Sequence, residues 1–293
     1  MNLQKRVHTL FKRLNSFLKK YTPFFKAGSM TQLAFKFDMF AWLLITAMQM
    51  ACVVFLWIAV YKNSAEGFES IINGYSFEEI ICYFIFSNIF AFVTFDDVTL
   101  FDINEEIKDG TIAISFIKPI SYRIRFASTN LGSTFTKILM IGIPFFAIAY
   151  ITFFVMGYLQ FVSVLHFVLF LALGFVCQIT SCLLLDTINY ICGVLCFYTT
   201  SGWGLNLAKS VFINFFSGVL IPLSFFPGSF GRVVELLPFA GIAQNSVLIF
   251  LGKVNFSQAG IFIAKNILWI CVFEFLGWIL FKHASKKVTV QGG

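Results

Sequence analysis

The segment "MFAWLLITAMQMACVVFLWIAVY", residues 39–61, is apolar and carries no charged side chain. A helix rises about 1.5 Å per residue, so about 20 mostly apolar residues cross the hydrocarbon of a bilayer. The whole chain resembles this segment in composition: 59% of its residues are hydrophobic and 12% are charged. Soluble domains carry about 25% charged residues. The sequence therefore predicts an all-α integral membrane protein.

Similar segments recur along the chain. They predict six transmembrane helices, at 39–61, 77–95, 128–155, 163–198, 207–223 and 261–281. The fourth would extend about 54 Å as one helix, against about 30 Å of hydrocarbon, and it contains Asp186 and Asn189. It is either one long or broken helix or two separate spans. We favour one helix, because two spans would place the C-terminus outside, against the distribution of basic residues.

The N-terminal arm holds the excess of positive charge. Residues 1–38 contain eight lysines and arginines and one acid, Asp38, so their sum of +7 equals the net charge of the whole chain. Basic and apolar positions alternate with a helical period. This pattern predicts an amphipathic helix that lies in the headgroup plane and ends at Pro23. A nucleic-acid binder would carry its basic stripe on a folded domain, so we expect lipid and no nucleic acid as its partner.

Basic residues also predict the orientation. Fifteen lie in 1–38, 96–127 and 282–293, whereas the loops expected outside hold Lys62, Arg232 and Lys253. Because cytoplasmic loops are enriched in lysine and arginine, both termini are expected in the cytoplasm. The chain 1–293 then forms a single domain: the basic helix 1–38, a membrane domain 39–281 and a cytoplasmic tail 282–293.

Motifs for chemistry are missing from the sequence. It contains no G-x-x-x-x-G-K-[ST] phosphate loop, no G-x-S-x-G and no H-E-x-x-H. Its seven cysteines lie in or beside apolar segments, and its three histidines are scattered. This spacing favours neither a metal site nor a disulfide framework. A membrane enzyme is therefore the least favoured function.

One segment gathers acidic residues. Six of the 14 acids fall within 96–109: Asp96, Asp97, Asp102, Glu105, Glu106 and Asp109. The sequence "NEEIKDG", 104–110, predicts a short helix with acids in its first turn and a stop at Gly110. An apolar ledge, 111–117, follows and ends before Lys118 and Pro119. The segment is either a docking surface for another protein or a solvated loop.

Two motifs resemble a known family. "EIKDGTI" at 106–112 with "IKPISY" at 117–122 resembles the segment between the second and third spans of ABC-2 type permeases, the membrane subunits of certain ATP-binding cassette transporters. "FFSGVLIPLSFFP" at 215–227, followed by "LLPF" at 236–239, resembles the end of their fifth span. The likeness extends over nearly the whole chain, including the basic interfacial helix.

The resemblance implies a function. The chain would be the permease of an exporter in a bacterial plasma membrane and would pair with a second permease, identical or paralogous. A P-loop ATPase subunit would bind ATP and Mg, leaving this chain without cofactors. The segment between spans two and three would be the coupling helix that contacts the ATPase. Its contact residues would be Glu105, Glu106, Asp109, Gly110, Thr111 and Ile112.

The segment after the fifth span is rich in helix breakers. Pro222, Pro227 and Pro238 cannot continue a hydrogen-bonded helix, and broken helix at membrane depth must be buried in protein or line a cavity. The resemblance implies a re-entrant pair of helices that forms an external gate. The alternative is an amphipathic external loop.

Glu274 lies within the last predicted span. An acid inside the membrane is a functional hypothesis, but it also pairs readily with a basic group on another helix. The rival function, an ATP-independent secondary transporter or channel, would need inward-facing ionisable residues near the midplane. The sequence offers only Glu274 and Asp186 for that role, and no internal repeat is evident.

Overall fold

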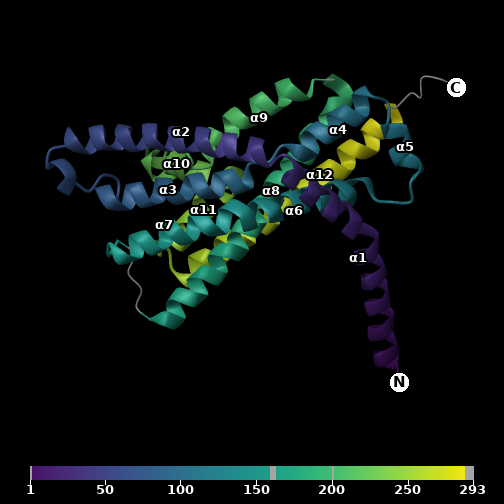
Figure 1. The fold of residues 1–293 in the computed structure, drawn as a ribbon, viewed down its shortest axis with the longest axis horizontal. Coiled ribbons are helices and arrows are strands. Elements are labelled where there is room, and N and C mark those ends of the chain that lie inside the picture. Colours follow the sequence, from purple (N-terminus) through teal and green to yellow (C-terminus); the bar gives the residue numbers. More distant parts are fainter. Residues whose placement is uncertain (1, 159–162, 200, 288–293) are drawn as a thin grey trace.

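A computed structural model describes residues 2–158, 163–199 and 201–287. Its regular structure is helical throughout this part of the chain, apart from one isolated bridge between Ile72 and Tyr75. The α-helices are α1 (Asn2–Ala34), α2 (Lys36–Lys62), α3 (Phe77–Thr94), α4 (Val98–Lys108), α5 (Ile112–Ile117), α6 (Tyr122–Lys137), α7 (Ile143–Val155), α8 (Val164–Thr199), α9 (Gly202–Phe216), α10 (Gly228–Leu236), α11 (Gln244–Phe250) and α12 (Phe256–Ala284). They form an elongated bundle from which the start of α1 projects (Figure 1). The all-α prediction is confirmed.

Five helical stretches of the described chain are long and apolar enough to cross a membrane. They are Lys36–Lys62, Phe77–Lys108, Tyr122–Val155, Val164–Thr199 and Phe256–Ala284. Each coincides with one predicted span, apart from differences at the ends. The predicted fifth span, 207–223, is not among them, because α9 has 15 residues and ends at Phe216. Gly218, with φ +83°, turns the chain there. The protein is thus a multi-pass membrane protein, and its described residues contain five helical stretches of spanning length.

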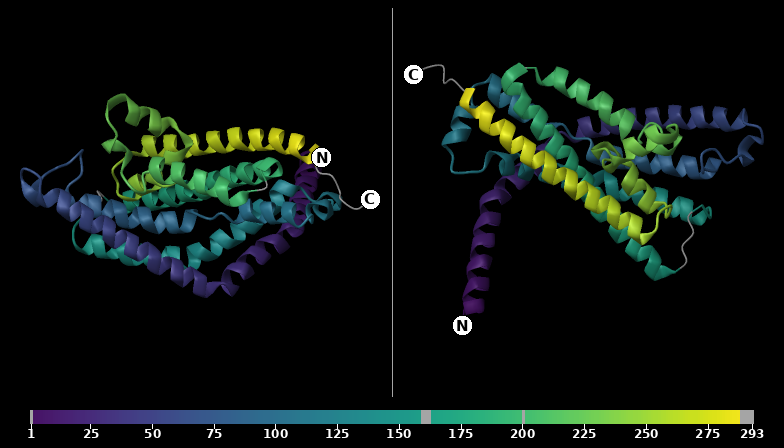
Figure 2. Two further views of the ribbon diagram at one scale, coloured as in Figure 1. Left: turned by 90° about the horizontal axis from the view of Figure 1, so that it is seen from above. Right: turned by 180° about the vertical axis from the view of Figure 1, so that it is seen from behind.

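The long fourth segment is a single helix. α8 contains 36 residues without a break, so the prediction of one helix is confirmed. Asp186 and Asn189 are buried against other helices, with 2% and 0% exposure, and do not face lipid. α12 packs along α8 and follows the length of one face of the bundle (Figure 2). These two packed helices form the centre of the fold, against which other helices lie.

The prediction that Pro23 ends the N-terminal helix was wrong. α1 continues through Pro23 to Ala34, because its second half is held along α6. An added Cβ on Gly28 would lie 1.9 Å from the Thr129 carbonyl oxygen, and one on Gly132 would lie 1.9 Å from that of Phe25. Such close contact gives packing that offsets the hydrogen bond lost at proline.

The predicted basic face of α1 falls partly outside the described residues, since the side chains of Lys5, Arg6 and Arg13 are not described. Lys12, Lys19 and Lys20 are exposed, as a helix in the headgroup plane requires. The end of the predicted tail, 288–293, also lies outside the described part.

Aromatic side chains fill the half of the bundle farthest from the coupling segment. Trp57, Phe84, Phe86, Phe146 and Phe250 are among the buried members of one cluster that joins α2, α3, α7 and α11. The Phe250 ring lies directly against Gly174 of α8, where a Cβ would meet it at 2.6 Å. Many phenylalanines of this chain therefore pack against one another inside the protein.

We predict that Gly132→Ala separates α1 from α6. The new methyl group would overlap the Phe25 carbonyl, and overpacking of this kind costs about 1–3 kcal/mol. The midpoint of thermal unfolding in detergent should fall, and protease should cleave α1 more readily.

Gly260→Ala is the matched control, because it lies in α12 with no atom within 4 Å of the added Cβ. It should leave the midpoint unchanged or raise it, since alanine favours a helix over glycine by about 1 kcal/mol. Equal effects of the two substitutions would contradict the close contact.

Candidate functional site

The predicted coupling segment consists of two short helices. α4 begins at Val98, six residues before the predicted start at 104, so Glu105 and Glu106 lie near its end. The prediction that these acids lie in a first turn was wrong, because the helix extends toward α3. Its stop is confirmed: the helix ends at Lys108, and Gly110 adopts φ +71°. The apolar ledge is the helix α5.

The ledge presents apolar side chains to the surface. Ile117 is 83% exposed and Ile114 is 56% exposed. Glu105, Asp109, Gly110 and Thr111 are exposed beside them, whereas Ile112 is buried against the bundle. The six residues inferred from the resemblance are therefore not equivalent. Ile114 and Ile117, which were absent from that set, are the two most exposed apolar side chains of α5.

Glu106 is engaged inside the protein. Its carboxylate lies 2.6 Å from Arg125 Nη2 of α6 and accepts a hydrogen bond from Ser115 Oγ of α5 at 3.1 Å. The carboxylate thus fastens the coupling segment to α6.

Two more of the clustered acids are used internally. Asp96 and Asp97 form the break between α3 and α4. Asp96 lies 3.0 Å from Lys137 Nζ of α6, and Asp97 lies 2.5 Å from Lys209 Nζ of α9. Asn189 of α8 donates to the Asp96 carbonyl and accepts from Lys209. Three of the clustered acids, Asp96, Asp97 and Glu106, therefore serve internal pairing, a use that neither the docking nor the solvated-loop prediction included.

Arg123 joins three helices. Its guanidinium lies 2.6 Å from Asp186 of α8 and 2.6 Å from Glu274 of α12. Asp186 also accepts hydrogen bonds from Thr99 of α4 at 2.6 Å and from Asn130 of α6 at 2.8 Å. The pairing alternative for Glu274 is confirmed. Paired carboxylates of this kind are stable at low dielectric because each charge is hydrogen-bonded.

Sequence reasoning missed the basic partners of these acids. Arg123 was counted only as a loop charge, and Lys137 and Lys209 went unremarked although they fall within predicted spans. A lysine inside an apolar segment is as strong a signal as an acid there. Matching the intramembrane bases with the intramembrane acids would have indicated internal pairs.

The segment after α9 is irregular but buried. Gly218 and Gly241 expose carbonyls that accept hydrogen bonds from Tyr83 of α3 at 2.7 Å and from Ser181 of α8 at 2.5 Å. Gln244 of α11 accepts from the Leu223 amide at 2.7 Å. Side chains from the surrounding helices thus satisfy the broken backbone, as the membrane interior demands.

The three prolines mark the breaks of this segment. Pro222 precedes a 3₁₀ turn (Leu223–Phe225), Pro227 precedes α10, and Pro238 begins another 3₁₀ turn (Pro238–Gly241). Pro222 and Pro238 are buried, and Pro227 is exposed. Two short helices, α10 and α11, therefore lie between α9 and α12.

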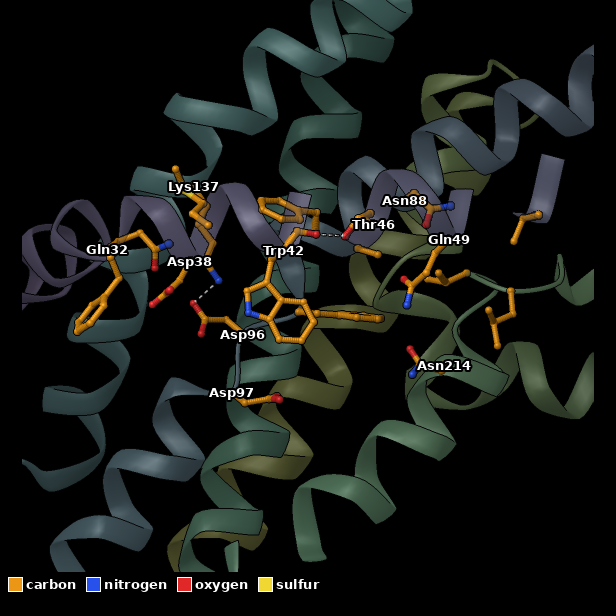
Figure 3. Close-up of a pocket in the computed structure, with 18 of the residues that line it drawn as sticks. Gln32, Asp38, Trp42, Thr46, Gln49, Asn88, Asp96, Asp97, Lys137 and Asn214 are labelled. Carbon is orange, nitrogen blue, oxygen red and sulfur yellow. Dashed lines mark hydrogen bonds and ion pairs between the residues drawn. The ribbon is translucent and has the colours of Figure 1, made fainter. Parts of the chain in front are cut away.

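A cavity of about 790 Å³ lies between α2, α3 and α9. Its wall on α2 is one helical face, with Asp38, Trp42, Thr46, Gln49 and Val53 at intervals of three and four. Figure 3 shows two chemically different ends. Asp38, Asp96 and Lys137 lie at one end, and the amides of Gln49, Asn88 and Asn214 lie at the other.

The described residues hold no group of three or more histidine, cysteine or acidic side chains able to bind a metal ion. Each cysteine among them is free.

Comparison with known proteins identifies one family. A family model described as "ABC-2 family transporter protein" matches residues 47–292. The match includes the coupling segment, the cavity helices α3 and α9, and the irregular segment after α9. No curated protein sequence matches the chain.

We predict that Arg123→Gln strongly destabilises the bundle. It would leave Asp186, which is 2% exposed, without its cation. Breaking a buried pair on one side costs about 3–5 kcal/mol. The midpoint of thermal unfolding in detergent measures the loss.

Lys253→Gln removes a cation from a more exposed pair with Glu79, where the side chains are 21% and 41% exposed. It should cost less than about 1 kcal/mol. If both variants unfolded at the same temperature, the Arg123 cluster would not hold the helices together.

Proposed function

The chain belongs to the ABC-2 family of transporter proteins, and from this membership we propose that it is the permease subunit of an ATP-driven exporter. The family is a component of membrane transport that works with an ATPase partner. That partner would carry the P-loop and bind ATP and Mg, and the permease would need no cofactor of its own. The observation that carries the proposal is the apolar ledge on α5, exposed on a segment whose other side is fastened into the bundle.

The ATPase would dock on this ledge. Ile114 and Ile117 are exposed, and buried apolar contacts supply most affinity at interfaces. The exposed acids Glu105 and Asp109 would set register and association rate, with Gly110 and Thr111 between them and the ledge. Glu106 and Ile112 would support the surface from beneath, because they contact Arg125 and the bundle interior.

Movement would pass from the ledge to the spans through the ion pairs. Asp96 and Asp97 tie the root of α4 to α6 and α9, and Arg123 ties α6 to α8 and α12. Closure of two ATPases would displace α4 and α5 and tilt these helices with them. ATP would thereby shift the balance between two conformations of the permease, with no chemistry in this chain.

A second permease, identical or paralogous, would cover the open side of α2. Only 6% of the most apolar 18-residue segment of α2 is buried, and Trp42, Met48 and Phe55 are more than half exposed. The cavity opens beside this helix. Two such cavities facing one another would form the pathway.

The segment after α9 would form the external gate. We place α9 as a fifth, short span and α10 and α11 as the re-entrant pair, which gives six spans in all. Pro222, Pro227 and Pro238 would fix the breaks at which this gate bends. The hydrogen bonds from Tyr83 and Ser181 supply what irregular backbone needs at membrane depth.

The localisation follows from the charges. We propose a bacterial plasma membrane with both termini in the cytoplasm and the basic face of α1 on anionic lipid. Residues 1–293 would form one transmembrane domain, with the arm 1–38 on the membrane surface, the membrane domain 39–281 and the tail 282–293 in the cytoplasm.

An ATP-independent transporter is the second candidate. It is favoured by one observation: the ionisable groups Asp96, Asp97 and Lys137 line the cavity. Against it, Glu274 and Asp186 are engaged by Arg123. Recovery of an ATPase bound to the ledge would distinguish the two functions, because an ATP-independent transporter needs no such partner.

We predict that Ile117→Glu prevents ATPase binding. Ile117 is the most exposed apolar side chain of the ledge, so a charge there would have to be desolvated on docking, and loss of a key apolar contact costs about 2 kcal/mol or more. ATP hydrolysis recovered with the tagged permease from its native membrane should fall at least about tenfold, at equal amounts of inserted protein.

Ile71→Glu is the matched control, since Ile71 is 75% exposed in the loop between α2 and α3. It should leave the recovered hydrolysis unchanged. If ATP hydrolysis recovered with the Ile117→Glu permease were unchanged, the ledge would not be the docking surface.

A further inference from the structure

The volume and lining of the cavity between α2, α3 and α9 indicate what kind of ligand it suits. Its volume of about 790 Å³ lies within the range of about 300–1,000 Å³ that suits drug-sized molecules. Trp42, Phe92 and Phe95 line it together with aliphatic side chains. The lining therefore combines an aromatic and aliphatic surface with nearly as many polar side chains, which suits an amphipathic small molecule.

One end of the cavity is uncharged and polar. Gln49 of α2, Asn88 of α3 and Asn214 of α9 converge there (Figure 3). Asn88 donates to the Phe84 carbonyl of its own helix at 2.8 Å, which leaves its side-chain oxygen available. Within the described chain, the side chains of Gln49 and Asn214 make no hydrogen bond. Three amides from three helices thus offer both donors and acceptors to a ligand.

The other end has an imbalance of charge. Asp96 is neutralised by Lys137, and Asp97 is neutralised by Lys209. Asp38, in the first turn of α2, also lines the cavity, and no cation among the described residues pairs with it. The groups at this end therefore sum to one negative charge. Asp38 is exposed at this end, so its carboxylate is accessible to a cationic group that enters the cavity.

Resting on the proposed permease function, we propose that this cavity binds an amphipathic organic cation. Its ammonium group lies toward Asp38, its apolar body lies along Trp42, Phe92 and Phe95, and its uncharged polar groups reach the three amides. The aromatic rings add cation–π attraction. The Asp38 carboxylate would repel an anion, and a neutral molecule would gain no ion pair from it.

Dansylcadaverine and its N-acetyl derivative test the charge directly, because they share one hydrophobic body and differ in the ammonium group. Their fluorescence is titrated against the full-length chain in nanodiscs, with empty nanodiscs subtracted. We expect the amine to bind at least about fivefold more tightly, the gain of a partly exposed ion pair of about 1 kcal/mol. Asp38→Asn should remove this advantage and leave binding of the acetylated probe unchanged.

Two further variants fix the location. Glu69→Gln neutralises an exposed acid in the loop between α2 and α3 and should leave both probes unaffected. Thr46→Trp fills the middle of the cavity wall and should weaken both. Equal binding of the two probes, no binding of the amine, or an amine advantage that survives Asp38→Asn would each overturn the proposal.

The titration needs no ATPase, so its failure is distinct from failure of the permease function. Loss of probe discrimination, with ATPase still recovered on the ledge, would remove only the proposed ligand class. If the chain binds the amine more tightly than the acetylated probe but recovers no ATPase, the cation site is supported and the ATP-driven mechanism is contradicted.

Discussion

The pairing of Arg123 with Asp186 and Glu274 is the interaction on which the rest of the structure depends. α8 and α12 are long helices with apolar surfaces, and lipid gives such surfaces no hydrophobic driving force for association. The Arg123 guanidinium, shared between two carboxylates, supplies an electrostatic driving force instead, because each charge would otherwise be unpaired in a medium of low dielectric. Thr99 adds α4 to the same cluster through Asp186. The segment that carries the apolar ledge is thereby fixed to α8 and, through Arg123, linked to α12.

The same constraint explains the other polar features. Lys137 and Lys209 lie on helices α6 and α9, and each is held by an acid at the break between α3 and α4. At the far end of the bundle, Tyr83, Ser181 and Gln244 hold the irregular backbone after α9. Each break in a helix is accompanied by side chains from neighbours that satisfy it. Breaks at membrane depth are stable only under that condition, and they mark the places where helices are able to bend.

The sequence predicted the large features because they depend on composition. Apolar length placed the five spanning stretches, and the uninterrupted α8 followed from the charge distribution. Local signals failed where tertiary contacts outweighed them. Pro23 does not end α1, because Gly28 and Gly132 let two backbones touch, and the acids near Glu105 lie at a helix end since α4 extends to Val98. The partners of Asp96, Asp97 and Glu106 are distant in sequence, so spacing alone did not reveal them.

The proposed function requires that ATPases bind beneath this chain. Native mass spectrometry of the complex isolated from its own membrane in mild detergent tests it most directly. We expect an assembly of two permease chains, identical or paralogous, with two P-loop ATPase subunits, as the proposal requires. A chain that leaves the membrane alone, under conditions that preserve other membrane complexes, would contradict it and favour the ATP-independent transporter.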